Sequence, residues 1–403
     1  MKRLLFIIYM ACLLALPLLL SGCAGIYANT REVEELLVIQ TMGLDDDPAG
    51  VHLTLASAAG VHADGAPLRL EGRGPSITAA IERIRSLANE EDLFCAHISH
   101  VLIGEEAARS GLNRSLAYIC RSPDLRLSVP MYVLRGGEAA QAVLEVGNDR
   151  YGICDALDSV NGDVRLRGDG RVTTAADIAR DLARQGSALI CAVDCLPSAE
   201  KTAPESGDGS GETREALAQN SSAAQEAPLM TVSAAGYGVL KDGRLCAYID
   251  RDKAVAVGLL TGESGPCELI VTGQDGGKTT LSLERGSAQL QPVWAADGTL
   301  TRLEITVEAQ AAVAETETAD APEQAELRAL LETALSERVG AVLQLSKQLH
   351  ADFLGLGSRI ERQDPRRMAS LERPFAELLA ETPIRLSVSA RLTHTNDTEE
   401  ADT

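Results

Sequence analysis

The segment from Pro197 to Pro228 constrains the fold most, because it divides the chain into two halves. It is rich in Ala, Ser, Glu, Gly and Gln, has no aromatic residue and has almost no large apolar one. A segment of this composition cannot bury enough apolar surface to offset the entropy lost on ordering. We therefore predict a flexible acidic linker at residues 197–228, between an N-terminal region at 23–196 and a C-terminal region at 229–395, with a polar tail at 396–403.

The N-terminal region alternates between the two-residue period of strands and the longer period of helices. We expect strands at residues 36–44, 51–55, 98–103, 127–134 and 187–193, with a turn at 45–50. We expect helices at residues 77–87, 105–120, 137–146 and 177–184. Ser76 is a candidate N-cap for the first helix, whose apolar face holds Ile77, Ile81, Ile84 and Leu87, and Gly111 is a candidate break in the second.

The longest helix is predicted in the C-terminal region. Seven apolar residues repeat there every three or four positions, as expected of an amphipathic helix that faces a core: Leu327, Leu331, Leu335, Val339, Val342, Leu345 and Leu349. We expect strands at residues 231–240, 245–249, 280–283, 303–307 and 384–392, and a hinge or loop at 311–322. Since helices and strands mix in both halves of a 403-residue chain, we predict a multi-domain α+β protein with mixed sheets packed by helices.

The N-terminus has the pattern of an export signal. Met1-Lys2-Arg3 precede an apolar run from Leu4 to Leu20, and Leu20-Ser21-Gly22-Cys23 has the pattern of a lipobox. We expect residues 1–22 to be a lipoprotein signal peptide and the Cys23 thiol to take a diacylglyceryl group, which holds the chain at the outer face of the cytoplasmic membrane. The alternative is a plain membrane anchor, for which the apolar run is near the lower length limit.

The composition argues against two classes of binding protein. The formal net charge is −21, so the chain should repel nucleic acid and anionic head groups. The lipid, rather than a basic patch, must then hold it to the membrane. Aromatic residues make up only 3% of the chain, which disfavours a sugar-binding cleft or a stacking platform for single-stranded nucleic acid.

Cysteine and histidine form no complete metal or redox motif. In the run from Cys95 to His100, a strand would place Cys95 and His97 on one face and His100 on the other. No second ligand pair has a suitable spacing for zinc. Cys191 and Cys195 have three residues between them, whereas the motifs need two. We interpret most of the seven cysteines after Cys23 as small buried apolar residues.

Two further patterns fall short of catalytic motifs. The run from Gly273 to Thr279 resembles a phosphate-binding loop, but Thr272 stands where the motif needs its first glycine. Because a strand-like pattern follows it, we interpret Asp275-Gly276-Gly277 as a hairpin turn. No Gly-x-Ser-x-Gly elbow is present. We expect no catalysis, no cofactor and no metal.

Four blocks, in their order along the chain, resemble the Ger(x)C family of spore germination lipoproteins. The first is 31–36 followed by Gly43-Leu44-Asp45. The second runs from Ser76 through Phe94-Cys95-Ala96-His97 to 101–108. The third is 122–126 with Gly136-Gly137-Glu138-Ala139, and the last is 350–357 with Asp364-Pro365 and the closing strand.

The resemblance implies a lipoprotein of three α/β subdomains and no catalysis. It implies the C subunit of a nutrient germinant receptor, anchored at the inner membrane of spores beside integral-membrane A and B subunits. Cys23 is the one site residue carried over, as the lipidation site. His97, Asp124, Arg126 and Gly357 match family positions and are interpreted as structural, with His97 buried or Arg126 paired to a carboxylate.

Two other classes remain open. A solute-binding lipoprotein of an ABC-type transporter needs two similar lobes around a cleft, often lined by aromatic or clustered charged side chains. The low aromatic content speaks against that class. An exported hydrolase would need a nucleophile or metal motif, and we find none.

Overall fold

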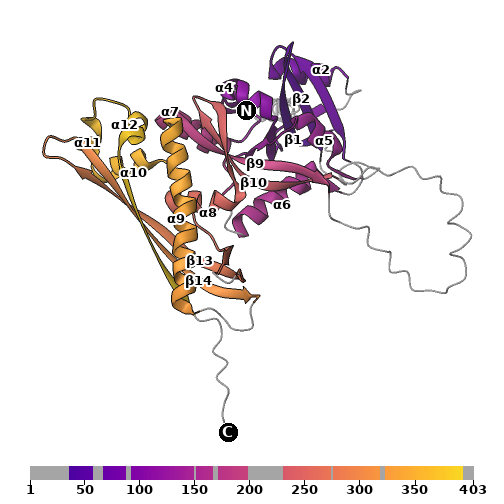
Figure 1. Cartoon of the computed structure of the whole chain (residues 1–403). Helices are drawn as coiled ribbons and strands as arrows, with labels where there is room; N and C mark the ends of the chain where they lie inside the picture. The colour runs from indigo at the N-terminus through magenta and orange to yellow at the C-terminus, as the bar shows by residue number, and fades with distance from the viewer. Residues whose placement is uncertain are drawn as a thin grey trace, which may run out of the picture.

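The computed structural model describes residues 36–57, 67–87, 92–148, 151–166, 171–197, 230–273, 276–317 and 323–393. Within this part, a nine-stranded sheet and a four-stranded sheet organise the chain, and helices pack on both (Figure 1). Both sheets contain parallel and antiparallel pairs. The predicted α+β class with mixed sheets is therefore confirmed.

The first sheet has a parallel centre and antiparallel hairpins at both sides. Its strand order is β11 (Arg244–Asp250), β10 (Met230–Lys241), β9 (Ser187–Pro197), β6 (Met131–Leu134), β5 (His100–Ile103), β1 (Leu36–Asp47), β2 (Gly50–Ser57) and β3 (Arg69–Gly74), with β4 (Asp92–Phe94) beside β1. β1, β5, β6 and β9 run parallel to their neighbours in this group. Every residue of β5 and β6 is buried, as expected for parallel strands covered on both faces.

Helices cover the two faces of the first sheet. α2 (Ile77–Arg85), α3 (Glu105–Ser110), α4 (Asn113–Arg121) and α7 (Ala175–Gln185) contribute to the core on one face. α5 (Ala139–Glu145) and α6 (Ile153–Leu166) contribute to the core on the other, near a small ribbon of β7 (Gly147–Asn148) and β8 (Tyr151–Gly152). Local signals act as predicted, since the Ser76 side chain accepts a hydrogen bond from the backbone of Ala79 and Gly111 separates α3 from α4.

The second sheet is covered on one face by the longest helix. Its strand order is β12 (Cys267–Thr272), β13 (Lys278–Trp294), β14 (Leu300–Thr316) and β15 (Ile384–Thr393). α9 (Gln324–Leu349) buries Leu331, Leu335 and Val339 against this sheet. α10 (Leu356–Gln363), α11 (Pro365–Ala369) and α12 (Phe375–Glu381) then lead from α9 to β15. The predicted helix and closing strand are confirmed.

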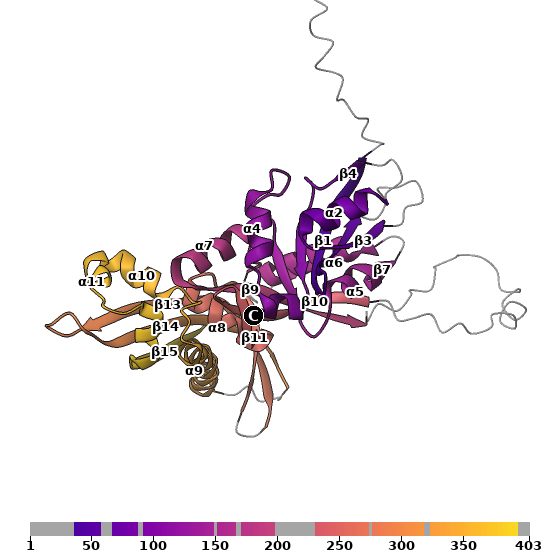
Figure 2. The same ribbon diagram turned by 90° about the horizontal axis from the view of Figure 1, so that it is seen from above.

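α8 (Arg251–Thr261) lies between the two sheets (Figure 2). All of its residues from Ala254 to Leu260 are buried. They belong to one apolar core that includes Tyr237 and Val239 of the first sheet as well as α9 and the second sheet. The two sheets therefore share a core rather than being joined by a loop alone.

Several predicted elements need correction. The strand expected at 127–134 forms only at Met131–Leu134, and Leu127 is exposed. The hinge expected at 311–322 is wrong for 311–316, because these residues extend β14. Leu87 follows the end of α2 and is 60% exposed, so it is not part of the buried face. The helix α6 was not predicted, because Asn161 and Gly162 are poor helix formers and obscure its pattern.

Some predictions concern residues outside the described part of the chain. The signal peptide, Cys23, residues 198–228 of the expected linker and the tail at 396–403 all lie there. The strands on either side of residues 198–229, β9 and β10, pair antiparallel, so the first sheet is completed after this segment. The division of the chain at 197–228 stays a prediction.

Candidate functional site

The outer face of the second sheet, opposite α9, is polar. Along β15, Leu386, Val388 and Ala390 pack against the core, while Arg385 and Arg391 alternate with them and are exposed. This alternation follows from the two-residue period of a strand.

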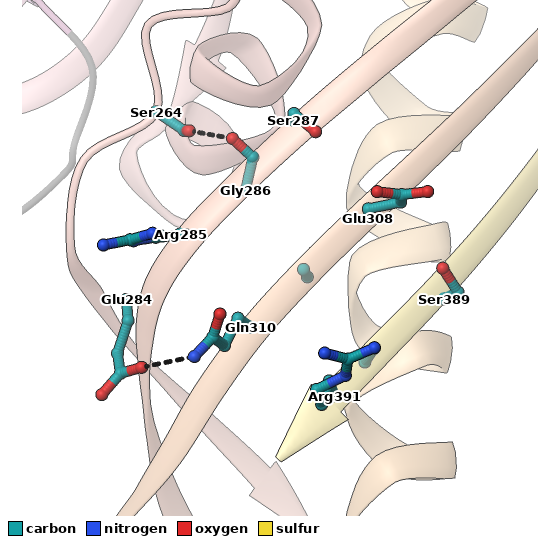
Figure 3. Close-up of a pocket in the computed structure, with 11 residues that line it drawn as sticks. Ser264, Glu284, Arg285, Gly286, Ser287, Glu308, Gln310, Ser389 and Arg391 are labelled. Atoms are coloured by element: carbon teal, nitrogen blue, oxygen red, sulfur yellow. Dashed lines mark hydrogen bonds between the residues drawn. The ribbon is translucent and has the colours of Figure 1, made fainter. Parts of the chain in front are cut away.

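A depression of about 690 Å³ lies on this outer face, where β13, β14 and β15 run side by side (Figure 3). Its charged and amide side chains are Glu284, Arg285, Glu308, Gln310 and Arg391. Gln310 donates a hydrogen bond to Glu284 over 3.3 Å. Two carboxylates and two guanidinium groups can form ion pairs and hydrogen bonds with a polar partner.

An irregularity in β13 shapes the depression. The pairing register with β14 shifts between Leu283 and Arg285, as happens at a β-bulge. Gly286 follows directly, and a Cβ atom there would collide with the side chain of Leu259 in α8. Ser264 donates a hydrogen bond to the Gly286 carbonyl over 2.6 Å. The bulge and the missing side chain therefore let β13 approach α8.

The structure does not bring Cys95, His97 and His100 together as a metal site. His97 is exposed and its ring lies 5.4 Å from that of Phe94. Cys95 is buried in the core beneath α2, whereas His100 bonds Asp158 of α6 on the opposite face of the sheet. The structural interpretation of His97 as a buried side chain is therefore wrong.

His100 lies in a polar cluster that was not predicted, in which its own side chain is buried whereas that of Asp158 is 65% exposed. Its Nε2 atom is 3.1 Å from a carboxylate oxygen of Asp158, and its Nδ1 atom is 3.4 Å from the hydroxyl of Tyr132. Burial lowers the pKa of His100, although Asp158 opposes this shift. Cys154 lies next to them and donates to Gln40 over 3.1 Å.

His100, Cys154 and Asp158 are the described residues that could hold a metal ion, because their donor atoms all lie within 4.8 Å of one another. However, each of these groups already has a protein hydrogen-bond partner. The cluster is therefore fully explained as a satisfied polar contact between α6 and the sheet. Sequence reasoning missed it because Cys154 and Asp158 belong to the helix that was not predicted.

Three further residues match positions of the Ger(x)C family: Gly357, Asp124 and Arg126. Gly357 is buried, and its N–H donates to Asp352 over 2.7 Å. A Cβ atom on Gly357 would lie 2.6 Å from the ring of Phe375, so the structural interpretation of this glycine is supported. Asp124 and Arg126 are exposed, and Arg126 forms no ion pair in the described part of the chain. The pairing of Arg126 with a carboxylate therefore stays a prediction.

Seven cysteines lie in the described part of the chain. Four are buried, which fits their interpretation as small apolar residues: Cys95, Cys154, Cys191 and Cys267. Burial raises the pKa of Cys95 to about 11 and that of Cys191 to about 12, so both stay protonated thiols. Cys120 and Cys246 are exposed.

Among the described residues, no helix is long and apolar enough to cross a membrane. Cys23 lies outside this part of the chain, so its lipidation stays a prediction.

The fold and its surfaces define an α+β protein whose two mixed sheets share a core and whose second sheet has an open polar face. Comparisons with known families identify both halves. Residues 29–191 match the family described as "Spore germination protein N-terminal domain". Residues 235–396 match the family described as "Spore germination B3/ GerAC like, C-terminal". The chain therefore belongs to the spore germination protein family, as the Ger(x)C resemblance predicts.

A solved structure has the same fold. The "Crystal Structure of the GerBC protein" matches with a TM-score of 0.52 and 16% sequence identity, and the match covers 90% of this chain and 99% of that chain. A search of curated proteins finds no match.

Proposed function

We propose that this protein is the lipid-anchored C subunit of a spore nutrient germinant receptor and acts through protein contacts. The observation that carries the proposal is the match of both halves to spore germination domains. The likeness to the GerBC fold over 90% of the chain supports the same assignment. We expect the integral-membrane A and B subunits as partners, no catalytic turnover, and a location at the outer face of the spore inner membrane.

The proposed anchor on Cys23 limits how far the first sheet lies from the membrane. β1 begins at Leu36, and about 13 residues span at most about 45 Å when fully extended. The net charge of −21 repels anionic head groups, so contact with the membrane depends on the lipid and on partner proteins.

A solute-binding lipoprotein of an ABC-type transporter is the alternative class. Neither family description nor the matching structure names such a protein. The two classes differ in the proteins with which the chain should co-purify, since a transporter lipoprotein would bring down a permease.

The anchor is tested by metabolic labelling with a clickable palmitate analogue, followed by fractionation of spores. The wild-type chain should carry the label and sediment with the inner membrane. Cys23→Ala should lose both, because the lipid is then absent. Cys120→Ala, which changes an exposed cysteine of α4, is the matched control and should behave as the wild type. Label on the Cys23→Ala chain, or no label on the wild type, would show that Cys23 is not the lipidation site.

A further inference from the structure

A second cleft, of about 380 Å³, lies where the first sheet meets the C-terminal helices. One wall comes from α7, Thr173 and Tyr237. The other comes from the end of α8, from Phe353 and Leu354, and from α10. Figures 1 and 2 both show α7 near α10, and an ion pair of 2.8 Å between Arg184 and Glu361 joins these two helices.

Arginine is unusually frequent in this cleft for a chain with a net charge of −21. Three of its five arginines are neutralised by carboxylates: Arg171 by Glu263 at 2.7 Å, Arg180 by Asp177 and Asp181 at 3.0 Å each, and Arg184 by Glu361. The other two arginines, Arg359 and Arg362, lie one turn apart on α10 and are not neutralised in this way.

Arg359 and Arg362 have no carboxylate partner in the described part of the chain. The guanidinium of Arg359 donates to the carbonyls of Leu260 and Ala288. Burial, with a smaller contribution from the neighbouring charge of Arg362, lowers the pKa of Arg359. The α10 wall therefore holds two positive charges that form no ion pair with a described carboxylate.

The opposite wall contains two buried hydroxyl groups. Thr173 lines the cleft and is only 4% exposed, yet its Oγ1 atom has no hydrogen-bond partner in the described structure. The Tyr237 hydroxyl accepts a hydrogen bond from the Arg171 backbone over 2.7 Å, so its own proton is available to donate. A buried hydroxyl without a partner is unfavourable unless a bound molecule supplies one.

We propose that this cleft binds a small solute with a carboxylate or phosphate group, held by Arg359 and Arg362 and by the hydroxyl of Thr173. Guanidinium groups form strong, often bidentate hydrogen bonds with both kinds of anion. The volume suits a small solute, and the buried side chains of Leu189, Val257 and Phe353 provide an apolar floor. A solute in this cleft contacts both the first sheet and α10, so its binding holds the first sheet and the C-terminal helices together. This inference is independent of the anchor and of the receptor partners.

The test is isothermal titration calorimetry of the purified full chain with two probes, inorganic phosphate and citrate, at an ionic strength matched with chloride. Binding of either probe to the wild type supports the proposal, and the probe that binds more tightly identifies the anion. Arg362→Gln should weaken binding about tenfold or more, because a charged donor is lost. Arg366→Gln removes an exposed arginine of α11 outside the cleft and should bind as the wild type does.

Thr173→Val separates a role in binding from a role in folding. The free protein should melt at the same or a higher temperature, because a buried hydroxyl without a partner has been removed. Its affinity for the probe should fall several-fold. The proposal is overturned if neither probe binds the wild type at millimolar concentration, or if Arg362→Gln and Thr173→Val both bind with unchanged affinity.

Discussion

Asp352 and Gly357 form a buried contact that sets the start of α10. The carboxylate of Asp352 accepts hydrogen bonds from the backbone N–H groups of Leu356 and Gly357, over 2.8 and 2.7 Å. These donors are the unpaired N–H groups of a helix start, which a carboxylate satisfies well. Phe375 covers Gly357 so closely that no side chain fits at this position.

Gly357→Ala should therefore destabilise the protein by about 1–3 kcal/mol, because the new methyl group overlaps the Phe375 ring. Gly340→Ala is the matched control. Gly340 lies within α9 with no atom near its would-be Cβ, so alanine should stabilise the helix by about 0.5–1 kcal/mol. Urea unfolding measures both values, and equal effects at the two positions would refute this description of Gly357.

The titration of Asp352 should reduce stability as the pH rises. Burial raises the pKa of Asp352 to about 7, against smaller opposing effects from the backbone N–H groups of Gly357, Leu356 and Gly355. The folded state thus holds the proton more tightly than the unfolded state, whose pKa is near 4. Stability from this group is fully present below the unfolded pKa and is lost as the pH rises towards 7.

The measurement compares the wild type with Asp352→Asn, so that titrations elsewhere cancel. The free energy of unfolding of the wild type, relative to that of the variant, should fall between pH 4 and pH 7 by up to about 4 kcal/mol. A difference that stays constant or rises over this range would show that the carboxylate is already ionised at pH 4.

At the scale of elements, α9 shows why periodicity predicts some helices well. Its apolar residues repeat over the whole length of the helix, and Leu327, Leu331, Leu335 and Val339 are all buried where the sequence places them. The closing strand β15 is equally clear, because its polar and apolar residues alternate strictly. α6 has no such signal, since Asn161 and Gly162 interrupt it, and so the His100 cluster that depends on α6 could not be predicted either.

Leu335→Ala should destabilise the protein by about 2–5 kcal/mol, because it leaves a cavity between α9 and the second sheet. Leu87→Ala is the control of the same residue type, and since Leu87 is 60% exposed its effect should stay within about 0.5 kcal/mol. Denaturant unfolding at constant pH gives both values. A small effect of Leu335→Ala would mean that the packing of α9 against the second sheet contributes little to stability.

At the scale of the whole molecule, the two halves are less separate than the sequence suggests. The polar composition of residues 197–228 predicts a flexible linker between two halves. However, β10 and β11 follow that segment and pair onto the first sheet, and α8 contributes to a core shared by both sheets. Composition cannot reveal this arrangement, because the pairing of β10 with β9 is a long-range contact that no local pattern specifies.

The cleft between α7 and α10 also depends on long-range contacts that no local sequence pattern specifies. Arg171 and Arg180 lie far from Arg359 and Arg362 in the sequence, and only the docking of α7 against α10 brings the two pairs to one site. By contrast, family membership could be predicted, because the order of the short blocks can be recognised in the sequence without knowing which residues are in contact.

A receptor subunit that works through protein contacts should co-purify with the other subunits of its receptor. The measurement is affinity purification of the tagged full chain from detergent-solubilised spore inner membranes, with the co-purified proteins identified by mass spectrometry. We expect two integral-membrane receptor subunits to co-purify with the wild type and with Cys120→Ala, and to be lost with Cys23→Ala. Recovery of a transporter permease instead, or of no membrane protein from spores that contain the chain, would contradict the proposed function.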